Sequence, residues 1–495
     1  MQIGALVRRA AVHHGALPCL TEGGRTLTYA EFDAATDRLG NALLARGLQP
    51  GDRVGVLLPN SIECIIAYYA LAKSGLVRVG MNTRETLGDH NYKLTDSGAR
   101  AVLHKGQDGL CPDIQIDWDE ICAMIDTGDR APCKVDRPLD APYRLGYTGG
   151  TTGSPKAVTL TTRGELAELS AFLTDLVPGI RCGDTFLHAA PIAHASGAFF
   201  LPALVRGARS LVMTRFDAGD FIRLAEAEKA TMTFLVPTML AMLLEEPSLA
   251  DADLRFQTIA YGASPIAEDV LRRAQETFKG ADFVQVYGLT ETAGGATNLP
   301  PEAHDPAKGK LRSCGIPNPG MEVRVVDDKG EEVPVGDVGE IVIRGGSIMK
   351  GYWNRADATK DAIRNGWFYT GDAGYFDKDG FLFIHDRVKD MIVSGGENIY
   401  PREVEEILYR CPGVQEVAVV GLADEKWGQA VTAFVVRSDP ALSPQALDAF
   451  CKASEDLAPY KRPRRYEFLE SLPLNPSGKV LRRELVARHA PQQAA

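Results

Sequence analysis

The sequence predicts an α/β fold, in which a large N-terminal part has helix-covered, mostly parallel sheets and a smaller C-terminal part mixes helices with strands. Three observations lead to this fold class. Strand and helix patterns alternate from residue 28 to about residue 320, a strand–turn–strand pattern follows, and the pattern changes again near residue 400. The chain has 495 residues, 45% of them apolar, which exceeds one simple domain of about 100–200 residues.

The first elements alternate as a parallel sheet requires. Thr28 and Glu31 have the spacing of a capping box, so a helix is expected to begin after Thr28. Val54–Leu58 is a short apolar run that ends at a proline-asparagine turn, which indicates a strand. Ser61 begins a second helix and Val77 a second strand. A strand–helix–strand order favours parallel strands with the helix packed on one face.

The later elements differ in kind. Val323–Val326 and Ile341–Arg344 are strand patterns, and the turn residues Asp-Asp-Lys-Gly follow the first of them. Pro401 fits the first position of a helix, and strand patterns follow at Val417–Val420 and Val431–Val436. This part is therefore expected to be an α+β domain.

The chain is predicted to divide into domains of residues 1–386 and 387–495. The change of pattern places the boundary near Asp386–Asp390. Because no long flexible linker marks it, the two domains are expected to meet through a short hinge.

Composition excludes several classes of protein. The net charge is −11, and the only dense basic run is Lys461–Arg465, so a nucleic-acid partner is not expected. Nine cysteines without a Cys-x-x-Cys pair favour reduced thiols and a cytoplasmic location over disulfides or a zinc site. The apolar run Cys64–Ala72 is far shorter than the ~18 residues of a membrane helix, so no transmembrane segment is predicted. A homo-oligomer stays possible.

Five short segments carry groups suited to nucleotide chemistry. In chain order they are Tyr147–Lys156 (YTGGTTGSPK), Tyr287–Thr292 (YGLTET), Tyr369–Asp372 (YTGD), Arg387–Pro401 (RVKDMIVSGGENIYP) and Asn475–Lys479 (NPSGK). The first has small residues that let backbone N–H groups approach a phosphate, but it is neither a Walker A loop nor Gly-x-Gly-x-x-Gly. Each segment alone is also typical of a solvated loop or turn.

Together, in this order, the segments resemble the adenylate-forming superfamily of acyl-CoA synthetases, aryl-CoA ligases, luciferases and peptide-synthetase adenylation domains. The resemblance covers essentially the whole chain. It implies an N-terminal adenylation domain that binds ATP and acid and includes a small barrel-like β unit, and a small, mobile α+β lid domain. It also implies an AMP-forming acid–CoA ligase, which converts acid and ATP to acyl-AMP and pyrophosphate and then forms acyl-CoA and AMP. The implied cofactors are ATP, coenzyme A and Mg²⁺.

The resemblance also assigns a nucleotide site. Its members are Thr148, Gly149, Gly150, Thr151, Thr152, Gly153, Lys156, Tyr287, Gly288, Thr290, Asp372 and Arg387. Tyr287 is expected to pack on adenine, and Asp372 to accept both ribose hydroxyls, as a carboxylate can. Glu291 is expected to bind Mg²⁺ and to act in catalysis, because magnesium held with nucleotide phosphates prefers hard oxygen ligands. Many members have Ser where this chain has Gly149, and Gly where it has Ala157, which leaves one hydroxyl fewer for the phosphates.

Two further residues are catalytic by resemblance. Lys479 resembles the lysine of the mobile lid domain, a cation that draws the acid carboxylate and the α-phosphate together. His194 matches a ring between the acid pocket and the nucleotide; the alternative is a buried histidine with a backbone hydrogen-bond partner. The same small domain is expected to serve both steps by turning about Lys389.

The C-terminal part is most similar to bacterial aryl-CoA ligases of the chlorobenzoate type. By that resemblance Trp427 and Tyr460 flank the adenine of CoA and Arg462 binds its 3′-phosphate, contacts that stacking and bidentate hydrogen bonding suit. Gly395 and Gly396 line the passage for the pantetheine chain. The alternative is that Trp427 belongs to the core and that the basic run is a solvated turn.

The acid is expected to be compact and mainly apolar, a benzoate- or cinnamate-like acid first and a medium-chain fatty acid second. By resemblance its pocket draws on residues 190–200, 234–239 and 261–265, which include Phe199 and Phe234. No acidic side chain there is placed to hold the ammonium of an amino acid. Two other functions stay open: a stand-alone adenylating enzyme that loads a carrier protein, and a non-catalytic relative that binds acyl-adenylate.

Overall fold

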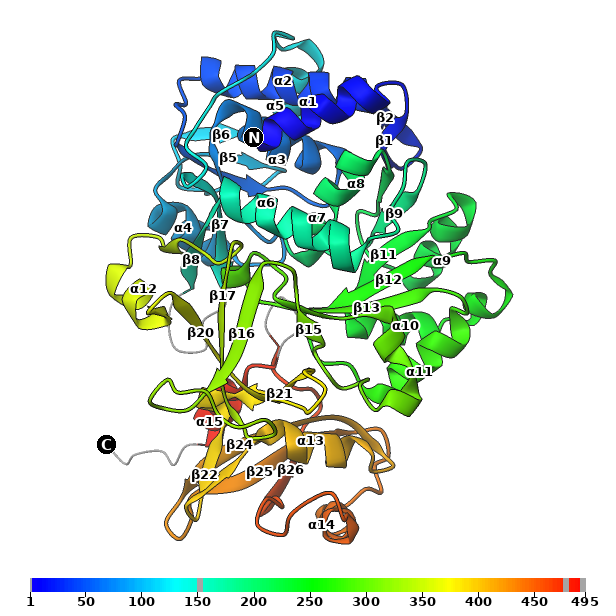
Figure 1. Cartoon of the computed structure of the whole chain (residues 1–495), viewed down its shortest axis with the longest axis vertical. Coiled ribbons are helices and arrows are strands. Elements are labelled where there is room, and N and C mark those ends of the chain that lie inside the picture. The colour runs from blue at the N-terminus through cyan, green and yellow to red at the C-terminus, as the bar shows by residue number, and fades with distance from the viewer. Residues whose placement is uncertain (1, 149–154, 475–479, 490–495) are drawn as a thin grey trace. The chain divides into compact units, whose positions relative to one another are not determined.

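The structure is a computed structural model that describes residues 2–148, 155–474 and 480–489. Its contacts divide the chain into two compact units (Figure 1). The N-terminal unit comprises Met1–Val323 with Ile343–Phe368, and the C-terminal unit comprises Arg324–Val342 with Tyr369–Ala495. The functional boundary expected after residue 386 stays a prediction.

The larger sheet of the N-terminal unit has nine strands in the order β15-β14-β13-β12-β11-β9-β10-β1-β2. The strands from β13 to β1 in this order are parallel, and β15, β14 and β2 are antiparallel additions at the edges. The strands are β1 Pro18–Glu22, β2 Arg25–Thr28, β9 Thr185–His188, β10 Arg209–Val212, β11 Met232–Leu235, β12 Thr258–Gly262, β13 Asp282–Tyr287, β14 Thr297–Leu299 and β15 Ile316–Pro317.

The second sheet of this unit has seven strands in the order β18-β8-β7-β4-β3-β5-β6. The strands from β7 to β6 are parallel, whereas β8 and β18 are antiparallel. The strands are β3 Arg53–Leu57, β4 Val77–Gly80, β5 Ala99–His104, β6 Ile114–Ile116, β7 Pro142–Thr148, β8 Lys156–Thr161 and β18 Gly351–Tyr352. The predicted parallel pair of β3 and β4 is confirmed.

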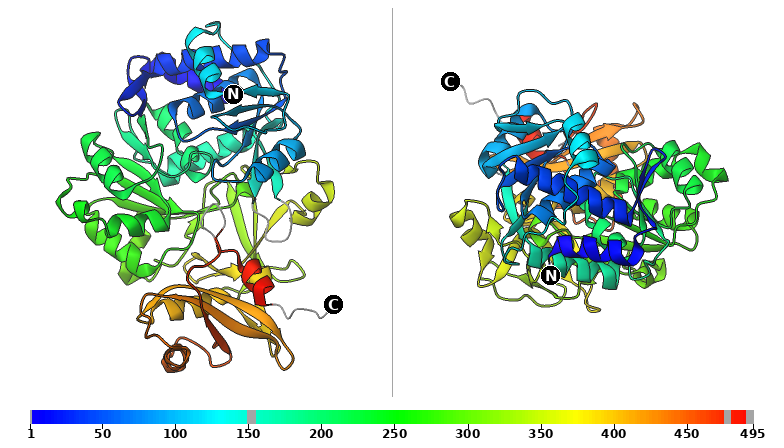
Figure 2. Two further views of the ribbon diagram at one scale, coloured as in Figure 1. Left: turned by 180° about the vertical axis from the view of Figure 1, so that it is seen from behind. Right: turned by 90° about the horizontal axis from the view of Figure 1, so that it is seen from above.

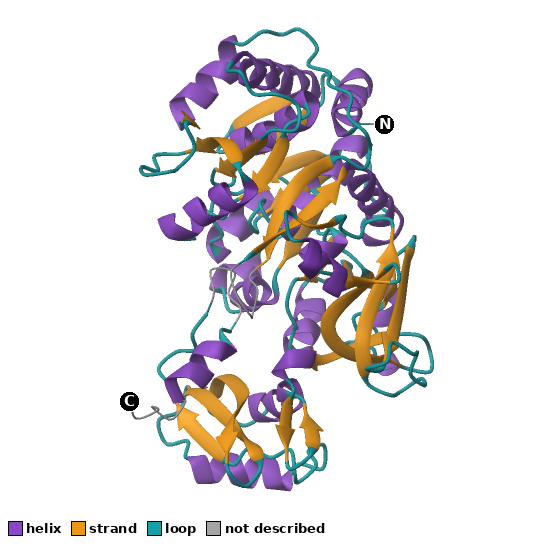
Figure 3. Ribbon diagram, turned by 90° about the vertical axis from the view of Figure 1, so that its left-hand side faces the viewer, coloured by secondary structure: helices purple, strands orange, loops and turns teal. Residues whose placement is uncertain are grey.

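Helices cover these sheets, as their alternation with strands predicts (Figure 3). Thr28 makes both bonds of the capping box with Glu31, and the Ser61 side chain accepts from the N–H of Cys64, so both predicted helix starts are confirmed. The α-helices are α1 Ile3–His14, α2 Tyr29–Ala45, α3 Ile62–Ser74, α4 Leu87–Ser97, α5 Trp118–Thr127, α6 Thr162–Ala171, α7 Ala195–Ala198, α8 Phe200–Arg206, α9 Ala218–Ala227, α10 Pro237–Leu244, α11 Glu268–Thr277 and α12 Ala356–Ala362. Shorter helical turns are η1 Phe172–Leu176, η2 Pro247–Asp251, η3 Thr290–Thr292, η4 Pro301–His304 and η5 Pro306–Lys308.

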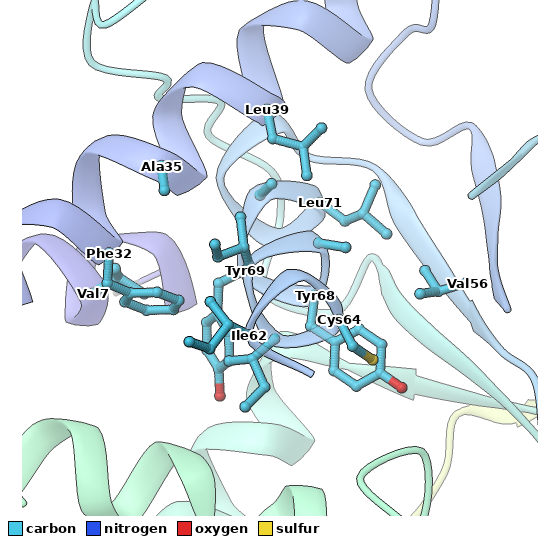
Figure 4. Close-up of a cluster of buried hydrophobic side chains, with 14 of the residues drawn as sticks. Val7, Phe32, Ala35, Leu39, Val56, Ile62, Cys64, Tyr68, Tyr69 and Leu71 are labelled. Carbon is cyan, nitrogen blue, oxygen red and sulfur yellow. The ribbon is translucent and has the colours of Figure 1, made fainter. Parts of the chain in front are cut away.

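A core of aliphatic and aromatic side chains lies where α1 and α2 pack against α3 (Figure 4). Figure 2 shows the N-terminal helices, in blue, from two further sides. Phe32 of α2 packs edge-on against Tyr69 of α3, and both rings are buried. Helix α3 is buried on nearly all sides, and its sequence is apolar apart from Ser74 and from Glu63 and Lys73, which form ion pairs. Within the described residues, no helix combines the length and the apolar character that crossing a membrane requires.

A five-stranded sheet follows, and the division between the two units runs through it. Its order is β16-β17-β20-β19, with β21 beside β20. The strands are β16 Met321–Val326, β17 Gly339–Gly345, β19 Ile363–Arg364, β20 Trp367–Phe376 and β21 Leu382–Arg387. The two strands predicted between residues 321 and 344 lie within β16 and β17.

The rest of the C-terminal unit is an α+β fold, as predicted. Its sheet has the order β23-β22-β25-β24 with β26 parallel to β25. The elements are η6 Val388–Asp390, β22 Ile392–Ser394, β23 Glu397–Ile399, α13 Pro401–Tyr409, β24 Val414–Asp424, β25 Gly428–Arg437, α14 Pro444–Ala453, β26 Arg465–Phe468 and α15 Arg482–His489. Val404, Ile407 and Leu408 of α13 are buried against this sheet.

Candidate active site

The predicted phosphate loop connects β7 to β8. The two strands are antiparallel, with Thr148 opposite Lys156, and the Thr148 hydroxyl donates to the Lys156 carbonyl at 3.5 Å. Gly149, Gly150, Thr151, Thr152 and Gly153 lie outside the described residues. The loop therefore begins and ends on a rigid strand pair, which fixes its two ends.

The segment Tyr287–Thr292 leaves the end of β13 and turns at once into η3. A side chain at Gly288 would collide with the carbonyl oxygen of Gly294, so this turn requires glycine. Ala293 closes the turn with a left-handed φ of 61°. The result is a tight loop that buries the Glu291 side chain to 7% exposure, with Tyr287 and Thr290 half-buried beside it.

Tyr352 completes this carboxylate site, and the sequence analysis missed it. The short strand β18 pairs with β8, with Tyr352 opposite Val158, and the Tyr352 hydroxyl donates to Glu291 Oε1 at 2.9 Å. Lys156 Nζ lies 5.1 Å from the centre of the Tyr352 ring. Burial, and next the charge of Glu291, raises the pKa of Tyr352, so its hydroxyl stays a donor at neutral pH. The only local signal was a glycine-tyrosine pair, Gly351-Tyr352, a few residues after the predicted strand Ile341–Arg344.

These groups fit Mg²⁺ held together with a nucleotide. Magnesium is commonly bound through one or two carboxylates and the phosphates of a substrate, and it keeps several waters. Glu291 offers one buried carboxylate near the phosphate loop, with Lys156 as a nearby cation. No group of three or more His, Cys, Asp or Glu side chains gathers as a metal site within the described parts of the chain. These side chains therefore suit a Mg²⁺ ion that takes its remaining ligands from the nucleotide phosphates and water.

Arg144 holds the same loop from behind. It donates through Nε to Glu165 at 3.0 Å and through Nη2 to the carbonyl of Ala293 at 3.1 Å. Glu168 is a third, buried member of the cluster, 3.7 Å from Arg144 Nη2. Arg144 thus ties β7 and α6 to the backbone two residues beyond Glu291. A lone charge within an otherwise uncharged strand was the sequence signal for it.

His194 precedes α7 and is exposed, with its Nε2 3.3 Å from Asn82 Nδ2. The buried histidine of this region is His188, six residues earlier. Its ring contacts Ser196 and the Ser210 hydroxyl, each at 3.1 Å, and burial lowers its pKa to about 4. His194 therefore has the access that a role near substrate requires, whereas His188 is a neutral core residue.

The predicted acid-pocket phenylalanines lie in the core of the larger sheet. Phe199 and Phe234 are both buried, and their rings stack at 5.3 Å between centres. Gly262 ends β12, where a side chain would collide with the carbonyl of Val286, and Ala263 follows with a left-handed φ of 68°. The exposed surface near this turn belongs to Ala263 rather than to the rings.

Asp372 and Arg387 are cross-strand neighbours in the C-terminal unit. They lie opposite each other on β20 and β21, and Arg387 Nε is 3.3 Å from Asp372 Oδ1. Asp372 is buried, and its N–H donates to the Thr370 hydroxyl at 3.0 Å. Gly371, between them in sequence, has a left-handed φ of 72°. The register of β20 and β21 thus places a carboxylate and a guanidinium side by side, as the predicted contacts to one ribose require.

The predicted CoA residues lie in turns and a loop of the C-terminal unit: between β22 and β23, between β24 and β25, and between α14 and β26. Trp427 is half-buried, not a core residue, and Arg464 lies 5.2 Å from the centre of its ring. Gly395 packs on that ring: a Cβ there would lie 3.0 Å from Trp427 Cε3, and its φ is 63°. Tyr460 is exposed, whereas Arg462 forms an ion pair with Asp448. Gly396 is exposed as well.

Lys479 lies outside the described residues, but the helix that follows it is described. Arg482 at its start donates to Glu405 Oε1 at 2.7 Å, and its Nη1 lies 3.6 Å from Asp390 of η6. Glu405 also accepts from the N–H of Val419. This cluster joins the segment after Lys479 to α13, β24 and η6.

Comparison with known proteins agrees with this arrangement. The model of the AMP-binding enzyme family matches residues 7–353, and the model of the AMP-binding enzyme C-terminal domain matches residues 403–479. The chain belongs to the AMP-binding enzyme family. The prediction that this AMP-binding enzyme belongs to the adenylate-forming superfamily and has its α/β fold is thereby confirmed. The particular closeness to chlorobenzoate-type ligases stays a prediction.

Three relatives illustrate the likeness. The fatty acid–acyl-carrier-protein ligase ScoC of Streptomyces coeruleorubidus is 38% identical over 489 residues, covering 96% of this chain and 94% of the relative. A feruloyl-CoA synthase of an Amycolatopsis species is 37% identical over 501 residues, covering 97% and 98%. The structure of o-succinylbenzoate CoA synthetase from Bacillus subtilis with its acyl-adenylate intermediate has a TM-score of 0.88 and 33% identity, covering 99% of this chain and 98% of that one.

Proposed function

We infer that the chain is an AMP-forming acid–CoA ligase. It activates a carboxylic acid with ATP and Mg²⁺ as an acyl-adenylate, releases pyrophosphate, and then transfers the acyl group to coenzyme A. The observation that carries this inference is the Glu291–Tyr352–Lys156 cluster beside the phosphate loop, in a chain that matches both family models along most of its length. That cluster offers a carboxylate for the metal and a cation for phosphate at one place.

The residues act by position and charge. Glu291 would hold Mg²⁺, which when bound neutralises the charge that develops on the transferring phosphate. The Tyr352 hydroxyl orients the Glu291 carboxylate, and Arg144 keeps the backbone beyond it in place. Lys479 is proposed to supply a second cation between the acid carboxylate and the α-phosphate. Tyr287, Asp372 and Arg387 are proposed to hold the adenosine.

The second step is proposed to use the C-terminal unit. Trp427 offers a flat, half-exposed ring and Tyr460 an exposed one, both suited to stacking on adenine. Arg462 is paired with Asp448, so a phosphate would share or replace that carboxylate. Gly395 lies beside Trp427 and Gly396 borders open space, so the absence of side chains at both leaves room for a thin chain.

One lid domain, residues 387–495, is proposed to serve both steps by turning about Lys389. Proline at this position restricts φ to about −65° and should trap one orientation. We expect Lys389→Pro to spare acyl-AMP formation and to stop thioester formation. Half-reactions measured separately, with Lys389→Ala as the control for loss of the side chain, test this. Normal overall turnover of Lys389→Pro would contradict the pivot.

The acid is proposed to be compact and mainly apolar, with benzoate- or cinnamate-like acids first and medium-chain fatty acids second. Of the residues predicted for its pocket, Gly262 and Ala263 are small and apolar and Ala263 is exposed, whereas Phe199 and Phe234 are buried core rings. A cytoplasmic location fits the nine free cysteines.

A carrier protein is the second candidate acceptor, because ScoC, a carrier-protein ligase, is 38% identical to this chain. Pantetheine is common to both acceptors, so the passage at Gly395 and Gly396 suits either. Trp427 and Arg462 distinguish them, since they serve the nucleotide end of CoA only. Trp427→Ala should raise the KM for CoA and leave the KM for a phosphopantetheinylated carrier unchanged.

The function is tested by pyrophosphate release over a panel of acids, with and without CoA. Benzoates, cinnamates, C6–C10 fatty acids, malonate, palmitate and amino acids form the panel, a range chosen for a pocket of about 300–1,000 Å³. We expect the highest kcat/KM with an aryl or medium-chain acid and acyl-CoA formation only with CoA. A best rate with malonate, palmitate or an amino acid would refute the acid class and leave the two-step reaction intact.

A further inference from the structure

Helix α4 contacts the chain on both sides of the phosphate loop. Just before the loop, the hydroxyl of Tyr147 donates to Asp96 Oδ2 at 3.0 Å, and the rings of Tyr147 and Tyr92 meet edge to face with centres 6.5 Å apart. Just after the loop, the Tyr92 hydroxyl donates to the carbonyl of Pro155 at 2.8 Å. Tyr92 and Asp96 are four residues apart on α4, so they lie on one face of the helix. This face therefore holds the chain at both ends of the loop.

Asp96 uses its second carboxylate oxygen for a segment far away in the sequence. Arg355 Nη2 donates to Asp96 Oδ1 at 2.6 Å, and the Asp96 side chain is only 10% exposed. Arg355 follows β18, the strand of Tyr352, and Asn354 turns the chain between them with a left-handed φ of 52°. Since the Tyr352 hydroxyl donates to Glu291, the Asp96 carboxylate is connected to the carboxylate proposed for Mg²⁺.

The two bonds of Asp96 are of a strong kind. Hydrogen bonds to an ionised carboxylate are roughly twice as strong as those between neutral groups, and burial strengthens them further. The Tyr147 hydroxyl also lies 3.0 Å from the Lys93 carbonyl, but the carboxylate is the stronger acceptor. Burial, and next the charge of Asp96, raises the pKa of Tyr147, so the hydroxyl keeps its proton at neutral pH. Lys93 itself pairs with Glu85 at 2.5 Å, so Arg355 is the cation that balances Asp96.

The backbone alone holds β18 weakly. This strand has two residues, and within the described sheet it pairs with β8 alone, at the edge. Lys156, the first residue of β8, has its Nζ 5.1 Å from the centre of the Tyr352 ring. A shift of β18 would therefore move both the hydroxyl that holds Glu291 and the ring beside Lys156. Because few backbone bonds resist such a shift, the ion pair of Asp96 with Arg355 is expected to fix the position of this strand.

We propose that Asp96 is a positioning residue for the adenylation step. It holds the ends of β7 and β18 in the relative position that brings Lys156 and Glu291 to one nucleotide, and it acts through Tyr147 and Arg355 rather than by contact with ATP. Activation of the acid needs both groups at once, because the metal carboxylate and the cation must meet the phosphates of the same ATP, and small displacements of such groups are costly in rate. The proposal rests on the proposed ligase function and adds to it a residue outside the five motifs.

The test measures kcat and KM for Mg·ATP in pyrophosphate release, with the acid of the panel that the wild type activates fastest, and separately measures thioester formation from the matching acyl-AMP. Asp96→Ala should lower kcat/KM for Mg·ATP by about 10- to 100-fold, as expected for the loss of a charge-assisted hydrogen bond. Thioester formation should stay close to the wild-type rate, because pyrophosphate has already left. Asp96→Asn keeps the shape and an oxygen acceptor, so it should recover most of the loss, and it guards against misfolding of the alanine variant.

A double-mutant cycle separates positioning from a general loss of stability. If Asp96 acts through β18, Asp96→Ala should raise the KM for Mg·ATP less in the Tyr352→Phe background than in the wild type. Asp89→Asn is the matched control, because Asp89 lies on the same helix but caps its start by accepting from the N–H and hydroxyl of Thr86. Its effect should be independent of Tyr352→Phe, and it should leave the ratio of the two half-reactions unchanged.

Three results would overturn the positioning role: an equal loss of both half-reactions in Asp96→Ala, independent effects of Asp96→Ala and Tyr352→Phe, or the same pattern from Asp89→Asn. If the wild type releases pyrophosphate with no acid of the panel, the proposed ligase function fails and this inference fails with it. If the wild type does so and Asp96→Ala has a normal kcat/KM for Mg·ATP, only this inference is refuted.

Discussion

Each unit holds an arginine among carboxylates beside a predicted functional segment, and the two arginines join different kinds of segment. In the N-terminal unit Arg144 joins β7 and α6 to the loop of Glu291, all within one sheet-and-helix body. In the C-terminal unit Arg482 joins α15 to α13 and to η6, next to the predicted pivot. The Arg144 cluster holds the loop of Glu291 in place. The Arg482 cluster instead attaches the segment after Lys479 to the rest of the C-terminal unit.

The largest effect is expected from the lid. If Lys479 supplies a cation only when the lid adopts its adenylating orientation, Lys479→Ala should reduce acyl-AMP formation by about 10³-fold or more. Thioester formation from supplied acyl-AMP should largely survive, because the static site is intact. Single-turnover assays of the two half-reactions measure this. If Lys479→Ala remained folded but lost acyl-AMP formation and thioester formation equally, Lys479 would not act in the first step alone.

The two arginines can be compared directly. Arg144→Met leaves Glu165 and Glu168 without their cation and should lower the stability of the N-terminal unit by about 3–5 kcal/mol. Arg482 has a more exposed side chain, 26% against 17% for Arg144, so Arg482→Met should cost the C-terminal unit less. Urea unfolding followed by hydrogen exchange resolves the units. We also expect Arg144→Met to slow both half-reactions and Arg482→Met mainly the first; the opposite pattern would contradict the comparison.

Acid should weaken the two units differently. Burial lowers the pKa of His188 from 6.5 to about 4, so the unfolded chain binds the proton first and stability is lost as the pH falls through that range. The loss should reach about 3 kcal/mol below pH 4. Burial instead raises the pKa of Asp390 and Glu405, so their contribution to stability is present at low pH and is lost as the pH rises.

Hydrogen exchange at pH 7 and pH 5 checks this, and the amides of the N-terminal unit should lose more protection. His188→Gln, which cannot titrate, should remove about half of the difference between the two pH values, because burial also lowers the pKa of His304 in the same unit to about 4. If the C-terminal unit lost more protection than the N-terminal unit, the acid sensitivity would not come from the buried histidine His188.

The smallest effect is expected at Tyr352. Tyr352→Phe removes the hydrogen bond to Glu291 and should cost about 1 kcal/mol, seen as a severalfold higher KM for Mg²⁺ with ATP. Tyr409→Phe removes a hydroxyl that donates to the Val417 carbonyl in the C-terminal unit and is the matched control. An unchanged magnesium dependence in Tyr352→Phe would show that Glu291 needs no such support.

Much of the fold followed from patterns within a few residues. The capping box at Thr28 and Glu31, the start of α3 after Ser61 and the strands β3 and β4 all appeared close to where they were predicted. Such features depend on neighbours along the chain, so a single sequence contains the information. The ordered motifs likewise identified the family, because their residue types and order are visible without the fold.

The sequence alone determined the α/β class, the superfamily and the short segments that are proposed to carry the chemistry. Only the tertiary structure decided which distant side chains meet. The pairing of β18 with β8, far apart in sequence, places Tyr352 at Glu291. The hydrogen bonds of Arg144 to Glu165 of α6 and to the Ala293 carbonyl place this arginine behind the same loop. It also decided that His188 is buried and His194 exposed. These outcomes depend on strand register and on the packing of remote segments, which no local pattern encodes.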